Sequence, residues 1–151
     1  MEIELLGQLV LATILGSIVG LEREFARKTA GMRTFALVSL GSALFAILSR
    51  EGASQYSGAT DPTRIAAQIV TGVGFIGAGL IIFDKSKLRG VTTAAGLWVA
   101  AAIGTSIGFG FYALGIFASL LAVLVFTFMW QVEEKVVHPN RRKAYSHVKK
   151  Q

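Results

Sequence analysis

Three polar residues near the middle of the chain have the types and the spacing of a functional site. Asp61, Arg64 and Gln68 are three and four residues apart, so a helix that begins here carries them on one face. Asp61 followed by Pro62 is typical of a helix start. Arg64 needs a carboxylate, Asp61 or Glu51, because the helix dipole disfavours a cation in the first turn. Gln68 also needs a partner, so the three form either a functional polar stripe or a structural contact between helices.

Polar residues at the ends of other apolar runs form a second set of candidates. Thr92 and Thr93 open one run, where one of them is an expected N-cap and both can hydrogen-bond across helices. The charges around Gly31 either anchor the chain at a membrane surface or form an ion-pair cluster, for example Glu22 with Arg33. The candidates of this set are Glu22, Arg23, Arg33, Thr34, Thr92 and Thr93.

The sequence offers no combination of residues that indicates catalysis. It has no cysteine, which excludes disulfides, thiolate metal sites and cysteine nucleophiles. His138 and His147 are nine residues apart, which is not the spacing of a helical ligand pair. No paired carboxylates and no nucleophile with a base lie inside the apolar runs. We therefore expect no enzyme activity and no cofactor, and we assign no metal ligand.

One glycine pattern imitates a nucleotide site. Gly72-Val-Gly-Phe-Ile-Gly77 matches the dinucleotide-binding fingerprint GxGxxG. That fingerprint needs a strand before it, a helix after it and an acidic residue about 20 positions further on. Here it lies inside an apolar run, and the residue at that position is Thr92. We therefore reject a nucleotide site.

The candidates must be positioned by membrane-spanning helices. Hydrophobic residues make up 53% of the 151 residues and charged residues 16%, compared with about 25% charged in soluble domains. Uncharged runs cover 5–21, 34–49, 65–83 and 90–132. Because one span needs about 20 residues, the last run holds two helices, which separate near Gly108-Phe-Gly110. The sequence predicts an all-α membrane protein, a compact bundle of five transmembrane helices in a domain at 1–132, with a basic tail at 133–151. The expected helices cover about 3–21, 33–49, 63–83, 92–107 and 111–131.

The basic residues predict the orientation of this bundle. If the N-terminus is outside, every Lys and Arg except Arg50 and Arg64 falls on the inner side. This bias favours an outer N-terminus and a cytoplasmic C-terminus, and it requires an odd number of helices. The net charge of +6 therefore belongs to the membrane surface, and we expect the lipid bilayer as partner and no nucleic acid. The acidic start, Met1-Glu-Ile-Glu4, does not resemble a cleaved signal peptide.

Small residues predict where the helices come close together, because glycine lets two backbones approach. These positions serve either tight packing inside one bundle, or a dimer interface or a mobile, close-packed helix. They include two GxxxG pairs and a glycine-rich third span. The packing candidates are Gly16, Gly20, Gly72, Gly74, Gly77, Gly79, Gly104 and Gly108.

Several motifs, in order, resemble the MgtC/SapB family of bacterial membrane proteins. They are Gly20-Leu-Glu-Arg23, Ala30-Gly-Met-Arg-Thr34, Asp61-Pro-Thr-Arg-Ile-Ala-Ala-Gln68, Gly72-Val-Gly-Phe-Ile-Gly-Ala-Gly79 and Arg89-Gly-Val-Thr-Thr-Ala-Ala95 with Trp98. The resemblance implies a multi-pass protein of the bacterial inner membrane, in a family whose members are linked to growth in low magnesium and to survival in host cells. Longer members carry a soluble C-terminal domain, and we do not expect activities that depend on such a domain from residues 133–151.

Two functions follow from these observations. The first is a non-enzymatic regulator that binds another membrane protein, or a second copy of itself, through small-residue helix faces. The alternative is a small transporter or channel for Mg²⁺, an ion that prefers carboxylate oxygens. The available carboxylates lie at the edges of the spans, so a homo-oligomeric pore would be lined instead by Arg64, Gln68 and Thr71. We expect the regulator.

Overall fold

A computed structural model describes residues 2–55, 61, 63–84 and 87–132. Within these ranges five helices are long and apolar enough to cross a membrane, which confirms the predicted five-helix membrane architecture. In chain order the elements are α1 Glu2–Phe25, α2 Met32–Gln55, α3 Thr63–Leu80, β1 Ile82–Asp84, β2 Lys87–Arg89, α4 Val91–Gly108, α5 Tyr112–Leu124, a π-helical turn Val125–Met129 and α6 Trp130–Val132. The predicted tail at 133–151, with His138 and His147, lies outside the described residues.

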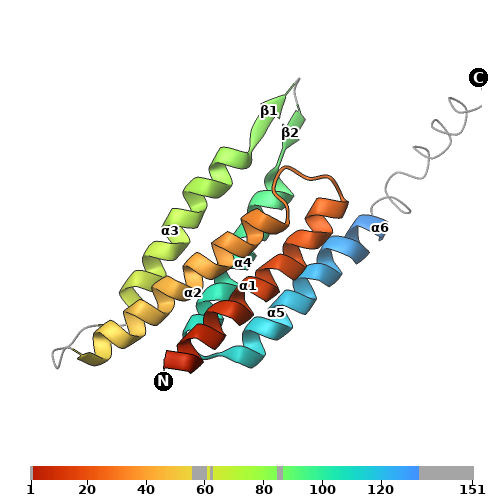
Figure 1. The fold of residues 1–151 in the computed structure, drawn as a ribbon. Helices are drawn as coiled ribbons and strands as arrows, with labels where there is room; N and C mark the ends of the chain where they lie inside the picture. Colours follow the sequence, from red (N-terminus) through yellow and green to blue (C-terminus); the bar gives the residue numbers. More distant parts are fainter. Residues whose placement is uncertain (1, 56–60, 62, 85–86, 133–151) are drawn as a thin grey trace, which may run out of the picture.

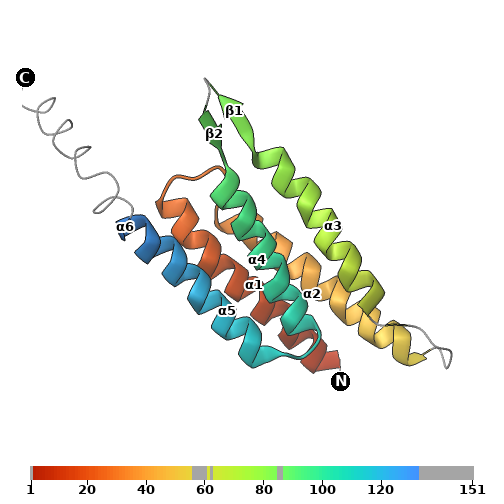
Figure 2. The ribbon, with the colours of Figure 1, turned by 180° about the vertical axis from the view of Figure 1, so that it is seen from behind.

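The helices run up and down in one bundle, with the start of α1 and the short α6 at opposite ends (Figure 1). α4 contacts α1, α2, α3 and α5, and half of its span is buried. α3 and α5 lie at opposite edges of the bundle (Figure 2). α3 packs against α2 and α4 through a narrow stripe of buried residues spaced four apart: Ile69, Val73 and Gly77. Most of the surface of α3 is therefore uncovered.

Glycines allow the close contacts that α2 makes with α1 and α4. A Cβ built on Gly16 would lie 2.6 Å from the Cβ of Ser39, and one built on Gly104 would lie 2.7 Å from the carbonyl carbon of the same residue. Gly20 and Gly108 approach α2 at similar distances. Since ordinary Cβ contacts begin at 3.4 Å, any side chain here would force the helices apart. Both GxxxG pairs thus lie at helix contacts within the chain.

The predicted break between the last two spans is confirmed. α4 ends at Gly108, and Gly110 adopts a left-handed conformation with φ of 84°. The Gly110 N–H donates to the Ile107 carbonyl at 3.0 Å, and the Phe111 N–H donates to the Ser106 carbonyl at 2.8 Å. This pair of bonds is a Schellman motif, in which glycine at the left-handed position reverses the chain at low cost.

Three predicted helix ends differ from the structure, the first being that of α1, which continues to Phe25 instead of ending near residue 21. α3 ends at Leu80 instead of near residue 83, because Ile82 and Phe83 pair with β2 in an antiparallel hairpin. β-branched and aromatic residues favour a strand, and the apolar run concealed this change. α2 continues to Gln55 instead of ending near residue 49, so Arg50 belongs to a helix of 24 residues.

Candidate functional site

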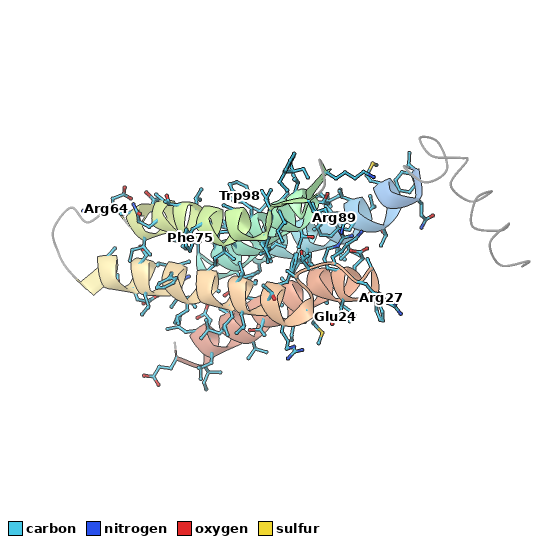
Figure 3. The ribbon with its side chains drawn as sticks, turned by 90° about the horizontal axis from the view of Figure 1, so that it is seen from above. Glu24, Arg27, Arg64, Phe75, Arg89 and Trp98 are labelled. Carbon is cyan, nitrogen blue, oxygen red and sulfur yellow. The ribbon has the colours of Figure 1, made fainter. Side chains whose placement is uncertain are left out.

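The predicted polar residues separate into two groups at opposite ends of the bundle. We call the end that carries β1, β2 and the start of α4 the hairpin end, and the other the Glu2 end. Figure 3 places Glu24, Arg27 and Arg89 at the hairpin end and Arg64 at the Glu2 end. A single site that combines all the candidates is therefore not formed in this chain.

A polar cavity of about 430 Å³ lies at the hairpin end. It is bordered by the end of α1, the start of α4 and the π-helical turn that follows α5. Four of the predicted candidates line it, namely Glu22, Arg23, Thr92 and Thr93, together with Lys28 and Phe126. Residues 70 positions apart in the sequence thus meet at one place.

Arg23 is a buried cation beside this cavity, with 4% of its surface exposed. Its guanidinium forms an ion pair with Glu22 and lies over the ring of Phe126, 3.8 Å from the ring centroid. A buried charge is costly unless it is paired, and both contacts offset that cost. Phe126 belongs to the π-helical turn, a rare irregularity that occurs frequently at functional sites.

Lys28 reaches the cavity because of the way in which α1 ends. The Lys28 N–H donates to the Arg23 carbonyl and the Arg27 N–H to the Glu24 carbonyl, each at 3.0 Å. Arg27 is left-handed, with φ of 52°, so the chain folds back over the helix end as a Schellman motif. A position that usually requires glycine is occupied here by arginine, which hid the motif from sequence analysis.

Arg33 and Thr34 do not reach the cavity. Arg33 is exposed in the first turn of α2, and Thr34 lines a groove between α2 and α3. The ion pair of Glu22 with Arg33, which was one alternative, is not formed, because Glu22 pairs with its neighbour Arg23. The start of α2 is stabilised instead by Glu24, whose carboxylate accepts a hydrogen bond from the Met32 N–H at 3.1 Å.

Asp61 caps α3, as its position before the helix predicts. Its carboxylate accepts hydrogen bonds from the Thr63 N–H at 2.8 Å and from the Thr63 hydroxyl at 2.7 Å. These bonds, with a smaller contribution from the charge of Arg64, lower the pKa of Asp61 below its ordinary value. The expected ion pair of Arg64 with Asp61 or Glu51 is not formed, since within the described ranges Glu51 pairs with Arg50 at 3.0 Å. Pro62 lies outside the described residues.

Gln68 lies on the outward face of α3, one turn beyond Arg64. It is exposed, and its amide makes no hydrogen bond in the part of the chain that the structure describes. It borders an apolar groove of about 600 Å³ between α2 and α3. Four positions of this outward face are Arg64, Gln68, Thr71 and Phe75, the last 85% exposed (Figure 3).

The glycines of α3 differ from those of the other helices. A Cβ on Gly72, Gly74 or Gly79 would meet nothing within 4 Å, whereas one on Gly77 would touch Ala94 at 3.5 Å. Tight packing inside the bundle is therefore wrong for the first three. They border open space on a helix that would allow another backbone to approach closely.

Sequence analysis missed a polar network at the Glu2 end. Gln8 is 2% exposed, and its amide donates to the Tyr112 hydroxyl at 2.7 Å. Arg50 donates to the Gly108 carbonyl at 3.0 Å and to the Gln8 side-chain oxygen at 3.5 Å. Arg50 thus satisfies a carbonyl at the C-terminus of α4, where the helix dipole favours a cation. A signal was present, because Gln8 is a polar side chain inside the first apolar run.

The described residues offer no cluster of three or more His, Cys, Asp or Glu side chains that could hold a metal ion. The charged groups that the structure brings together are ion pairs of Arg with Glu, at Arg23–Glu22 and Arg50–Glu51. The cavity at the hairpin end is the place where predicted candidates converge, and the outward face of α3 is the place where polar and small residues are uncovered.

Comparison with known proteins gives clear relatives. The model of the MgtC family matches residues 9–135. The putative magnesium transporter YhiD of Escherichia coli (strain K12) is 44% identical over 144 residues, which cover 93% of this chain and 67% of that protein. Protein MgtC of Brucella abortus (strain 2308) is 43% identical over 114 residues, which cover 76% of this chain and 46% of that protein. The chain thus matches about half of the Brucella relative. No solved structure matches the chain significantly.

Proposed function

The chain belongs to the MgtC family, and we propose that it is a bacterial inner-membrane protein that regulates another membrane protein without catalysing a reaction. We place its activity in adaptation to magnesium limitation or to the stress of life in a host. The contact with the regulated protein is the outward face of α3.

The observation that carries this proposal is the uncovered polar amide of Gln68. In a bilayer an amide without a partner is costly, and a transmembrane partner helix would supply hydrogen bonds that lipid tails cannot. Gly72, one turn beyond Gln68, and Gly79, about three turns beyond it on the same helix, are open positions where a partner backbone can approach. The groove between α2 and α3 gives room for side chains of that partner.

Substitutions that fill the space beside α3 test the proposal. Gly72→Leu places a bulky side chain in the groove, and Gly7→Leu on α1 is a matched control, because both glycines have no neighbour within 4 Å of a built Cβ. We expect both proteins to insert and fold. Only Gly72→Leu should fail to restore growth in low magnesium to a strain that lacks the gene. Full restoration by Gly72→Leu would rule out α3 as the contact.

The regulated partner and a second copy can be told apart by crosslinking. The chain has no native cysteine, so Phe75→Cys provides one reactive thiol at an exposed position of α3. A disulfide-linked dimer under mild oxidation indicates a homodimer through this face. Absence of the dimer, with full activity, indicates a different membrane protein.

The orientation is part of the proposal, with the hairpin end in the cytoplasm. It rests on the concentration of Lys and Arg at that end. A cysteine that replaces Arg27, an exposed residue at the hairpin end, should not react with an impermeant thiol reagent in intact cells. A cysteine that replaces Ala53, near the C-terminal end of α2, should react. The opposite pattern of labelling would reverse the orientation.

Magnesium transport is the second candidate, and the printed name of the E. coli relative supports it. Flux of Mg²⁺ into dye-loaded liposomes that contain the purified protein separates the two functions. Saturable flux that is lost in Arg64→Ala would establish transport and make the stripe at Arg64 and Gln68 its mouth. No flux from folded and inserted protein leaves the regulator.

A further inference from the structure

The cavity at the hairpin end carries more positive than negative charge. Arg23 and Lys28 supply two cations to its lining, and Glu22 supplies one carboxylate. That carboxylate is already bound by Nε and Nη2 of Arg23. The Nη1 group of Arg23 has no partner in the described part of the chain, and no fully buried side-chain nitrogen there is unpaired. A ligand in the cavity that Arg23 lines can therefore contact Nη1.

A second group of donors faces the cavity from α4. Thr93 is 4% exposed, and its hydroxyl makes no hydrogen bond with any described residue. Because no fully buried side-chain oxygen in the described ranges is unpaired, this hydroxyl also opens into the cavity. α4 begins at the same place, and the expected N-cap at Thr92 or Thr93 is wrong, because the N-cap is Gly90, which provides no side-chain acceptor. The first backbone N–H groups of α4 are thus left without a partner inside the helix.

These donors are arranged for an anion with several oxygens. The Arg23 guanidinium of α1, the Lys28 ammonium of the turn after α1, and the α4 N-terminus with Thr93 border one cavity of about 430 Å³. Guanidinium, ammonium and helix N-termini are the groups with which proteins bind phosphate. We propose that this cavity is a phosphate-binding site.

Two sources of phosphate fit the site, and a neighbouring groove distinguishes them. A largely apolar groove of about 570 Å³ runs between α1 and α5 and shares Glu22, Ala26 and Lys28 with the cavity. An anionic phospholipid would place its headgroup in the cavity and an acyl chain against Leu21 and Val123 in the groove. Inorganic phosphate would occupy the cavity alone.

The test uses the purified full chain in detergent. Native mass spectrometry measures binding of phosphatidylglycerol, with diacylglycerol, which lacks the phosphate group, as the uncharged control, and calorimetry measures binding of inorganic phosphate. Thr93→Val and Lys28→Gln should each weaken binding about tenfold, the value expected for loss of one hydrogen bond to a charged group. Binding of phosphatidylglycerol alone identifies a lipid site, and binding of inorganic phosphate identifies a soluble ligand.

The matched control is Arg27→Gln, one residue from Lys28. Arg27 is an exposed cation at the same end of the bundle and does not line the cavity. We expect its loss to change affinity by less than about twofold, as for exposed charges in general. An equal loss in Arg27→Gln and Lys28→Gln would show general surface attraction and overturn the site. So would equal binding of both lipids, or no binding of phosphate in either form by the folded wild type.

Discussion

Alanine at Gly104 should destabilise the protein, whereas alanine at Gly72 should not. Both glycines are inside helices, so the substitution adds the same methyl group. At Gly104 the new Cβ would lie 2.7 Å from the carbonyl carbon and 2.9 Å from the Cα of Ser39. Since these are backbone atoms, no change of rotamer can remove the overlap. The carbonyl oxygen of Ser39 is closer still, so α2 and α4 must move apart to restore an ordinary contact of 3.4 Å.

The expected magnitudes follow from this difference in space. Overpacking a close contact costs about 1–3 kcal/mol, and alanine instead of glycine gains at most about 1 kcal/mol in a helix. The free energy of unfolding should therefore fall, by up to about 2 kcal/mol, in Gly104→Ala. Gly72→Ala meets nothing within 4 Å, so its stability should stay equal or rise by up to about 1 kcal/mol.

Unfolding in mixed micelles with increasing sodium dodecyl sulfate, followed by circular dichroism, measures both changes under one condition. The comparison needs no knowledge of function, because it concerns the helix contacts alone. Equal stability of Gly104→Ala and Gly72→Ala would refute the close contact of α2 with α4. A large loss in Gly72→Ala would refute the open position of that glycine on α3.

Three further predictions concern other contacts of the chain. Tyr112→Phe should lower the free energy of unfolding by about 1–3 kcal/mol in the same assay, because it leaves a donor of buried Gln8 without a partner; adding Gln8→Leu should recover part of the loss. Arg27→Gly should raise stability by about 1 kcal/mol, since it relieves a left-handed arginine, and a decrease would contradict the Schellman end of α1. The capping by Asp61 should be complete above its ordinary pKa of 3.8 and lost as pH falls through the lower pKa of the folded state. Protection of the Thr63 amide from hydrogen exchange should fall over the same range of pH. In Asp61→Asn it should not fall, because the Asn side chain still accepts the hydrogen bond from the Thr63 N–H at low pH.

The architecture was predictable because the bilayer sets strong requirements on length and charge. The run at 90–132 is too long for one span, and the glycines near 108–110 indicated where it divides. The β-hairpin was not predictable, because Ile82 and Phe83 continue an apolar run and hydropathy does not distinguish a strand from a helix there. The end of α3 was misplaced for the same reason, whereas α1 and α2 continue past the charged residues at which their uncharged runs stop.

The site was predictable only in part, since its geometry depends on two local irregularities. The types and positions of Glu22, Arg23, Thr92 and Thr93 marked them as candidates, and the structure brings them to one cavity. Lys28 reaches it through a left-handed arginine, and Phe126 reaches it through a π-helical turn. Neither irregularity has a dependable signature in a single sequence. The partners of the charged residues were also predicted wrongly, because each forms an ion pair with its neighbour in the sequence. Glu22 pairs with Arg23, and Glu51 pairs with Arg50.

The two proposed surfaces lie on parts of the bundle that can be changed independently. The phosphate site is made by α1, α4 and the π-helical turn, which belong to the packed bundle, whereas the docking face is on α3 at its edge. The connection between them is the hairpin, because β1 follows α3 and Leu88 of β2 lines the cavity. Lys28→Gln should therefore weaken phosphate binding without altering crosslinking at Phe75, and Gly72→Leu should have the reverse effect. If phosphate binding changes the crosslinking of the wild type, the hairpin is the element through which the cavity acts on α3. Leu88→Ala removes the side chain that joins the hairpin to the cavity. It should then abolish the effect of phosphate on crosslinking, while phosphate binding and the contact through α3 are both retained.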